Sequence, residues 1–88
     1  MMEPGDGEAR ASFGVRGGML YVTATHLVLE GAAGLRIPIS EVEACRSRRR
    51  VFEVVWGGSR RRRLVLRMSS APAAAAESAV HAARRAIP

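Results

Sequence analysis

Residues 18–39 read Gly18-Met19-Leu20-Tyr21-Val22-Thr23, Ala24-Thr25, His26-Leu27-Val28-Leu29-Glu30, Gly31-Ala32-Ala33-Gly34 and Leu35-Arg36-Ile37-Pro38-Ile39. The three apolar runs have the length of single strands, and small or turn-forming residues separate them. Connections this short join antiparallel neighbours. We therefore expect a small β-meander that serves binding and not catalysis.

Four further strands are expected around this stretch, at residues 9–15, 42–46, 51–56 and 62–68. In the last two strands, apolar and polar side chains alternate, which is typical of an antiparallel hairpin with one face on the core. The residues expected on the core face are Phe52, Val54, Trp56, Leu64, Leu66 and Met68. Pro38 cannot donate to a ladder, which favours an edge position for residues 35–39.

The end of the chain predicts one helix. Ser69-Ser70 offers an N-cap, Pro72 falls in the first turn, and alanine-rich sequence continues to about Ala86. The apolar positions that recur at helical spacing are Ala76, Val80, Ala83 and Ile87. Side chains this small let a helix lie close against a sheet.

Composition indicates one small domain, with 48% apolar residues. Residues 1–8, rich in glycine and acid, are expected to be a disordered lead, and residues 9–88 the domain. No apolar run approaches the roughly 20 residues of a membrane-spanning helix. The first residues lack the basic start and apolar stretch of a signal peptide. We expect a cytoplasmic protein, with peripheral association at a membrane as an alternative.

The order of these elements resembles the pleckstrin-homology-like (PH-like) superfold, and within it the GRAM-like and bacterial PH-like domains. The resemblance spans about residues 9–87 and is carried by Gly18-x-Leu20-Tyr21-Val22-Thr23, Leu27-Val28-Leu29 and Ile37-Pro38-Ile39-Ser40-Glu41-Val42-Glu43. It implies a mainly β fold: a seven-stranded antiparallel half-open barrel of two near-orthogonal sheets, capped by a C-terminal α-helix. It also implies a scaffold that binds phosphoinositides, other anionic lipids or peptides, or that self-assembles. The lipid-binding signature has several basic residues across the first two strands, where this chain has Arg10 and Arg16.

All 14 cationic side chains are arginine, and the net charge is +6. Two clusters stand out: Arg46, Arg48, Arg49 and Arg50, and then Arg60, Arg61, Arg62 and Arg63. They flank the strand at 51–56, so they should lie at opposite ends of one hairpin, roughly 17–20 Å apart. In the architecture that the resemblance implies, Arg16 joins the second cluster. Arg16 with Arg60, Arg61, Arg62 and Arg63 is therefore the predicted anion- or partner-binding site. The alternative is a solvated basic face.

We expect no catalytic residues, no metal and no cofactor. His26 and His81 fall in different elements, with no carboxylate or cysteine at ligand spacing. Cys45, the one cysteine, follows apolar residues and should be a buried or half-buried free thiol. A catalytic thiolate needs a histidine or a helix N-terminus beside it, and the neighbouring sequence offers neither.

The sequence thus predicts a non-catalytic PH-like binding or adaptor module that engages a protein partner or an anionic surface through arginine-rich loops. One alternative is a self-assembling homo-oligomeric structural protein. Another is a peripheral binder of anionic membrane lipid or nucleic-acid phosphate. Single-stranded nucleic acid is favoured least, because stacking needs exposed aromatic rings. Phe13, Tyr21, Phe52 and Trp56 all fall in strand patterns that favour the core, although Trp56 at a strand end could be a half-exposed anchor.

Overall fold

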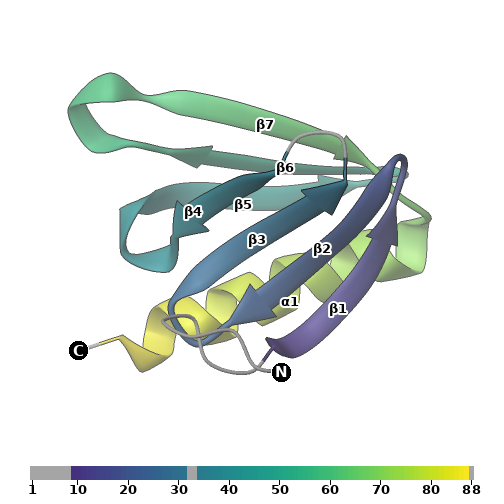
Figure 1. Cartoon of the computed structure of the whole chain (residues 1–88), viewed down its shortest axis with the longest axis horizontal. Coiled ribbons are helices and arrows are strands. Elements are labelled where there is room, and N and C mark those ends of the chain that lie inside the picture. The colour runs from purple at the N-terminus through teal and green to yellow at the C-terminus, as the bar shows by residue number, and fades with distance from the viewer. Residues whose placement is uncertain (1–8, 32–33, 88) are drawn as a thin grey trace.

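Seven antiparallel strands are followed by one C-terminal helix in the computed structural model, which describes residues 9–31 and 34–87 (Figure 1). The elements are β1 (Ala9–Val15), β2 (Gly18–Thr23), β3 (His26–Gly31), β4 (Leu35–Pro38), β5 (Val42–Arg48), β6 (Val51–Trp56), β7 (Arg62–Arg67) and α1 (Ser70–Ala86). Short 3₁₀ turns, Ile39–Glu41 and Gly58–Arg60, precede β5 and β7. The strands and the helix expected from the sequence are confirmed. The lead expected at residues 1–8 lies outside the described residues.

The strands form two antiparallel sheets, one with the order β1-β2-β3-β4 and one with the order β5-β6-β7. They are not closed into one barrel. Several strand boundaries differ from the sequence prediction by one or two residues, and the structure explains two of these differences. The fourth strand ends at Pro38, because the chain turns through a 3₁₀ helix directly after it. The fifth strand continues to Arg48, because Ser47 and Arg48 still pair with Phe52 and Val51 of β6.

The core lies between the two sheets and the helix. The largest fully buried side chains come from both sheets, from the Ile39–Glu41 turn and from α1: Phe52, Leu20, Leu27, Ile37, Ile39, Val22, Val54 and Val80. Trp56 is only 7% exposed, so it is a core residue and not a half-exposed anchor. Burying side chains of this size stabilises the fold by about 1.5–3 kcal/mol each relative to leaving them exposed.

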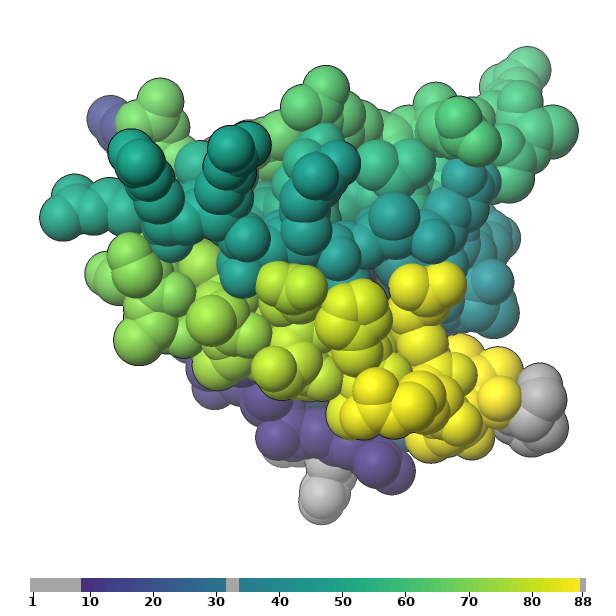
Figure 2. Space-filling view, turned by 180° about the vertical axis from the view of Figure 1, so that it is seen from behind, coloured from purple at the N-terminus to yellow at the C-terminus, as the bar shows by residue number. Residues whose placement is uncertain are grey.

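Helix α1 packs against β5 and β6 of one sheet and against β1 and β2 of the other. Its buried stripe is Ala73, Ala76, Val80 and Ala83, with Ile87 half-buried. Figure 2 shows the helix, green to yellow, lying between the β5 region above it and the β1 strand below it. Glu77 anchors the helix to β5, because its carboxylate accepts hydrogen bonds from the Ser47 N–H (2.8 Å) and Oγ–H (2.7 Å).

The helix begins after Ser69, the residue that the sequence offered as a cap. The Ser69 carbonyl accepts the first helical hydrogen bond, from the Ala73 N–H at 3.0 Å. The Ser69 side chain makes no capping hydrogen bond. Ser69 is therefore the N-cap through its main-chain carbonyl and not through its hydroxyl group.

The alanine stripe gives a test of how closely the helix packs. We expect Ala76→Leu to lower the free energy of unfolding by about 1–3 kcal/mol, because Ala76 is fully buried and a larger side chain must displace its neighbours. The matched control is Ala75→Leu at the neighbouring exposed position, which should change stability by less than about 0.5 kcal/mol. Thermal unfolding of both variants makes the comparison. Equal stability of the two would show that the helix does not pack as described.

Candidate anion-binding face

The sheet β5-β6-β7 has one face on the core and one in solvent, and this alternation collects arginines on the outer face. Phe52, Val54 and Trp56 of β6 are buried, so the alternate residues of β6 and their cross-strand partners point outward. In register, Arg46 lies opposite Glu53, and Arg48 opposite Val51. On the other side of β6, Val65 lies opposite Glu53, and Arg67 opposite Val51.

One carboxylate lies in the middle of this face. Glu53 forms ion pairs with Arg63 on β7 and with Arg46 on β5, the latter at 3.7 Å between Nε and Oε1. The two arginine side chains are 67% and 74% exposed, so each pair contributes little to stability. Glu53 lies on β6, between the strands that carry the two arginines, and its role is to position their guanidinium groups.

Two adjoining hollows are lined by these arginines. The first has a volume of about 1020 Å³ and is lined by Arg46, Arg48, Arg49, Arg50, Val51, Glu53, Arg63 and Ser70. The second, about 310 Å³, is lined by Arg16, Arg50, Val51, Arg67, Met68 and Ser69. Arg50 is common to both, so together they contain seven arginines, which we call the arginine face: Arg16, Arg46, Arg48, Arg49, Arg50, Arg63 and Arg67.

Local backbone geometry positions the turn residues of this face. Arg49, in the turn between β5 and β6, has φ of 54°, in the left-handed region that favours glycine. It is the one non-glycine residue with positive φ among those described. The next turn residue, Arg50, accepts a hydrogen bond from the Met68 N–H through its carbonyl (2.9 Å), which continues the pairing of β6 with β7. Side chains of this segment project from the upper part of the surface in Figure 2.

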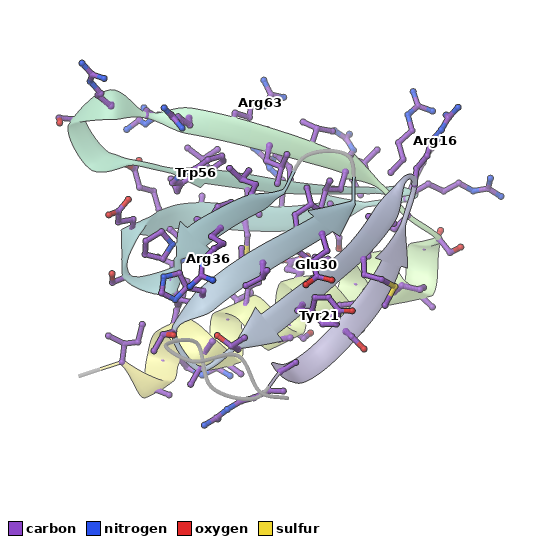
Figure 3. All side chains as sticks on the ribbon, in the orientation of Figure 1. Arg16, Tyr21, Glu30, Arg36, Trp56 and Arg63 are labelled. Atoms are coloured by element: carbon purple, nitrogen blue, oxygen red, sulfur yellow. The ribbon has the colours of Figure 1, made fainter. Side chains whose placement is uncertain are left out.

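The predicted site residues are regrouped by the fold. Arg16, at the β1–β2 turn, donates its main-chain N–H to the Arg67 carbonyl at the end of β7 (3.1 Å). It therefore lies beside Arg50 and Arg67, and the expectation that it joins Arg60, Arg61, Arg62 and Arg63 is wrong. The reason is topological: β7 runs back along β6, so the β6–β7 turn is a strand length away from this corner. Figure 3 shows Arg16 at the β1–β2 turn and Arg63 on β7.

The second cluster is divided. Arg63 faces the first hollow, whereas Arg60, Arg61 and Arg62 are exposed at the far turn, where the Arg61 Nε donates to Glu43 Oε1 (3.0 Å). The two clusters do start from opposite ends of β6, as the sequence indicated. Alternation along β7, which places Arg63 and Arg67 on the face opposite Leu64 and Leu66, is the sequence signal that identifies these two members of the arginine face.

A second group of reactive or titratable side chains, a cysteine, a histidine and a glutamate, lies where α1 packs against β5. The Cys45 Sγ is 3.8 Å from His81 Nε2, and the same nitrogen is 3.5 Å from Glu77 Oε2. The expectation that His81 has no carboxylate or cysteine beside it is therefore wrong. The helical spacing of Glu77 and His81 could have indicated the carboxylate, but the approach of Cys45 depends on the packing of the helix.

This arrangement does not activate the thiol. Burial raises the pKa of Cys45 to about 11, and the negative charge of Glu77 adds to the shift while Arg84 opposes it. Hydrogen bonds from Ser47, from its side chain and then its main chain, lower the pKa of Glu77. Cys45 is thus a protonated, buried free thiol at neutral pH, as expected from its sequence context.

No group of three or more His, Cys, Asp and Glu side chains in residues 9–31 and 34–87 could hold a metal ion. In the same part of the chain, no helix combines the length and the apolar character needed to cross a membrane.

Comparison of the chain with known proteins leaves the site to be interpreted from its own geometry. No protein-family model, no curated protein and no solved structure matches the chain.

Thiol chemistry tests whether His81 activates Cys45. Because the pKa of Cys45 is raised from 9.0 to about 11, the native thiol should react with a disulfide reagent at pH 8 about 100-fold more slowly than a thiol of ordinary pKa. Burial slows it further, so the unfolded chain should react much faster than the native protein. The measurement is the rate of labelling with and without denaturant. Fast labelling of the native protein at pH 7 would contradict this assignment and point to an activated thiolate.

Proposed function

We propose that this protein is a non-catalytic binding module, a PH-like half-open barrel whose arginine face binds an acidic partner protein. The observation that carries the proposal is the gathering of seven arginines around a single glutamate on one sheet and its adjoining corner. Guanidinium groups are planar forks that match carboxylates in charge and geometry. A surface of one sign also accelerates encounters with a partner of the opposite sign.

The PH-like architecture rests on the order of the elements. The resemblance implies seven antiparallel strands in two sheets and a closing helix, and the described residues form seven antiparallel strands, in sheets of four and three, followed by a covering helix. The hydrogen bond from Arg16 to Arg67 joins the two sheets at one corner, and α1 packs against both of them. These contacts support a half-open barrel.

A strained turn residue supports a binding role for the face. A left-handed conformation costs an L-residue roughly 1–2 kcal/mol, and Arg49 adopts it where glycine would be unstrained. Strain of this kind concentrates at functional sites. The conformation of the turn favours glycine at this position, so we attribute the presence of arginine to a binding role of its side chain.

The aromatic and apolar residues favour a protein partner over the other anions. Phe52 and Trp56 are buried in the core, so the outer face of their sheet lacks the stacking platforms that bind single-stranded nucleic acid. Val65 is the one exposed large hydrophobic side chain among the described residues, which leaves little apolar area to insert into a membrane. Self-assembly through this face is disfavoured, since it would bring like charges together.

A charge-matched pair of triple variants tests the face. We expect the protein to bind fluorescent poly-glutamate with an affinity that falls as salt is raised, because exposed charges are screened. Arg48→Ser, Arg50→Ser and Arg67→Ser together should weaken binding at least about tenfold, which corresponds to 1.4 kcal/mol. The control combines Arg60→Ser, Arg61→Ser and Arg62→Ser, which removes the same charge at the far turn and should change affinity less than about twofold. Fluorescence anisotropy at two salt concentrations measures both.

If both triple variants lost the same affinity for poly-glutamate, net charge alone would explain the binding, and the proposal would be overturned. Tighter binding of anionic vesicles or of single-stranded DNA than of poly-glutamate would support the peripheral alternatives instead. A concentration-dependent dimer or larger species in light scattering would support the self-assembly alternative.

Arg49→Gly separates binding from folding in the same assay. Glycine adopts the left-handed conformation without strain, so the variant should be as stable as the parent or more stable. It should nevertheless bind poly-glutamate more weakly, because it lacks the Arg49 side chain. Reduced affinity in a protein that unfolds at a higher temperature cannot be a consequence of misfolding.

A further inference from the structure

Strand β7 lies at the edge of its sheet, and its outward main-chain groups can be assigned from two hydrogen bonds. The Met68 N–H bonds to Arg50, on the β6 side, whereas the Arg67 carbonyl bonds to Arg16, on the opposite side. Main-chain groups alternate between the two sides along a strand. The N–H and C=O groups of Arg63 and Val65 therefore point away from β6. Figure 1 shows β7 as the outermost strand of its sheet, with β6 on its inner side.

The side chains along this edge belong to the arginine face. Arg63 and Arg67 lie on either side of Val65 at a spacing of two residues, all on the outer face of the sheet. Val65 is 49% exposed. A strand added at this edge would place its own side chains directly opposite Arg63 and Val65. Beside Arg67 the edge is already occupied by Arg16, so the added strand would end there, next to both arginines. The edge therefore offers, in order, a cation, an apolar side chain and a cation.

The same pattern argues against a second copy of this chain as the added strand. Two β7 edges pairing in antiparallel fashion about Val65 would place Arg63 of one copy opposite Arg67 of the other. Parallel pairing would place each arginine beside its own counterpart. Like charges directly opposite one another destabilise a strand pair, and charged side chains are a common protection of sheet edges. Charge repulsion therefore disfavours pairing between the β7 edges of two copies and favours an acidic strand.

We propose that an acidic, extended segment of the partner adds to the free edge of β7 as a further strand. This inference rests on the proposed function, since it identifies how the arginine face takes an acidic protein. The segment carries an acid, an apolar residue and an acid at alternate positions: the first two lie opposite Arg63 and Val65, and the last acid lies at the corner next to Arg67 and Arg16. Main-chain hydrogen bonds to Val65 and Arg63 supply affinity, and the flanking ion pairs supply selectivity.

Two matched peptides separate strand addition from simple charge attraction. The probe is Ser-Glu-Thr-Val-Thr-Glu-Ser, and the control is the same peptide with an N-methyl group on its central valine. The methyl group removes the N–H that would donate to Val65 but leaves the charge and the side chains unchanged. We expect the control to bind about tenfold more weakly, a loss of the order expected for a main-chain hydrogen bond and the contacts around it. Hydrogen exchange at the Val65 and Arg63 amides should slow with the probe only.

The protein-side test uses Val65→Pro, which removes an N–H that points away from β6 and therefore breaks no bond in the sheet. We expect this variant to bind the probe as weakly as the parent binds the methylated control, while it retains binding to poly-glutamate. Its thermal unfolding confirms the fold. Equal binding of the two peptides to the parent would overturn strand addition and leave the proposed function intact. Failure of both peptides and of poly-glutamate to bind would overturn both proposals.

Discussion

The close packing of α1 on both sheets is the contact on which the rest of the structure depends. Ala73 and Ala76 are fully buried, and their small side chains bring the helix main chain near β5, β6, β1 and β2 together. With the inner faces of both sheets covered in this way, each strand has one face committed to the core. The polar residues that alternate with the core residues have one place left, the outer surface.

The arginine face follows from this constraint. Because Phe52, Val54 and Trp56 are buried, the arginines of β5 and β7 emerge on one outer face, with Glu53 between them. The corner bond from Arg16 to Arg67 adds the β1–β2 turn to that surface. A basic surface is thus built from segments distant in sequence, and the partner proposed for it carries the opposite sign because charge complementarity favours that pairing.

Much of the fold could be predicted from the sequence, because period-two alternation and turn residues are local signals. The strand at 51–56 and the helix ending at Ala86 were predicted with their observed bounds or within a residue. The grouping of the arginines was predicted only in part. Alternation placed Arg63 and Arg67 outward, but the position of Arg16 depends on which ends of the two sheets meet, and no local pattern records that.

The neighbours of Cys45 show the same limit for buried groups. His81 lies 36 residues further along the chain, and its approach to within 3.8 Å depends on the packing of α1 against β5. A sequence can show that a cysteine lies in an apolar strand, but not which helical side chain will cover it. The pKa of Cys45 is raised because desolvation, together with the negative charge of Glu77, outweighs the positive charge of Arg84, so proximity to a histidine alone does not make a nucleophile.

The most direct test of this account is a map of where an acidic segment binds. In ¹H–¹⁵N spectra of the protein titrated with the acidic peptide, we predict that the largest shifts follow β7 and the corner formed by Arg16 and Arg50. The amides around Arg60 should move little, although that turn also carries three exposed arginines. Shifts centred on the Arg60 turn, or spread evenly over the arginines, would contradict the central claim that the fold concentrates binding on one face.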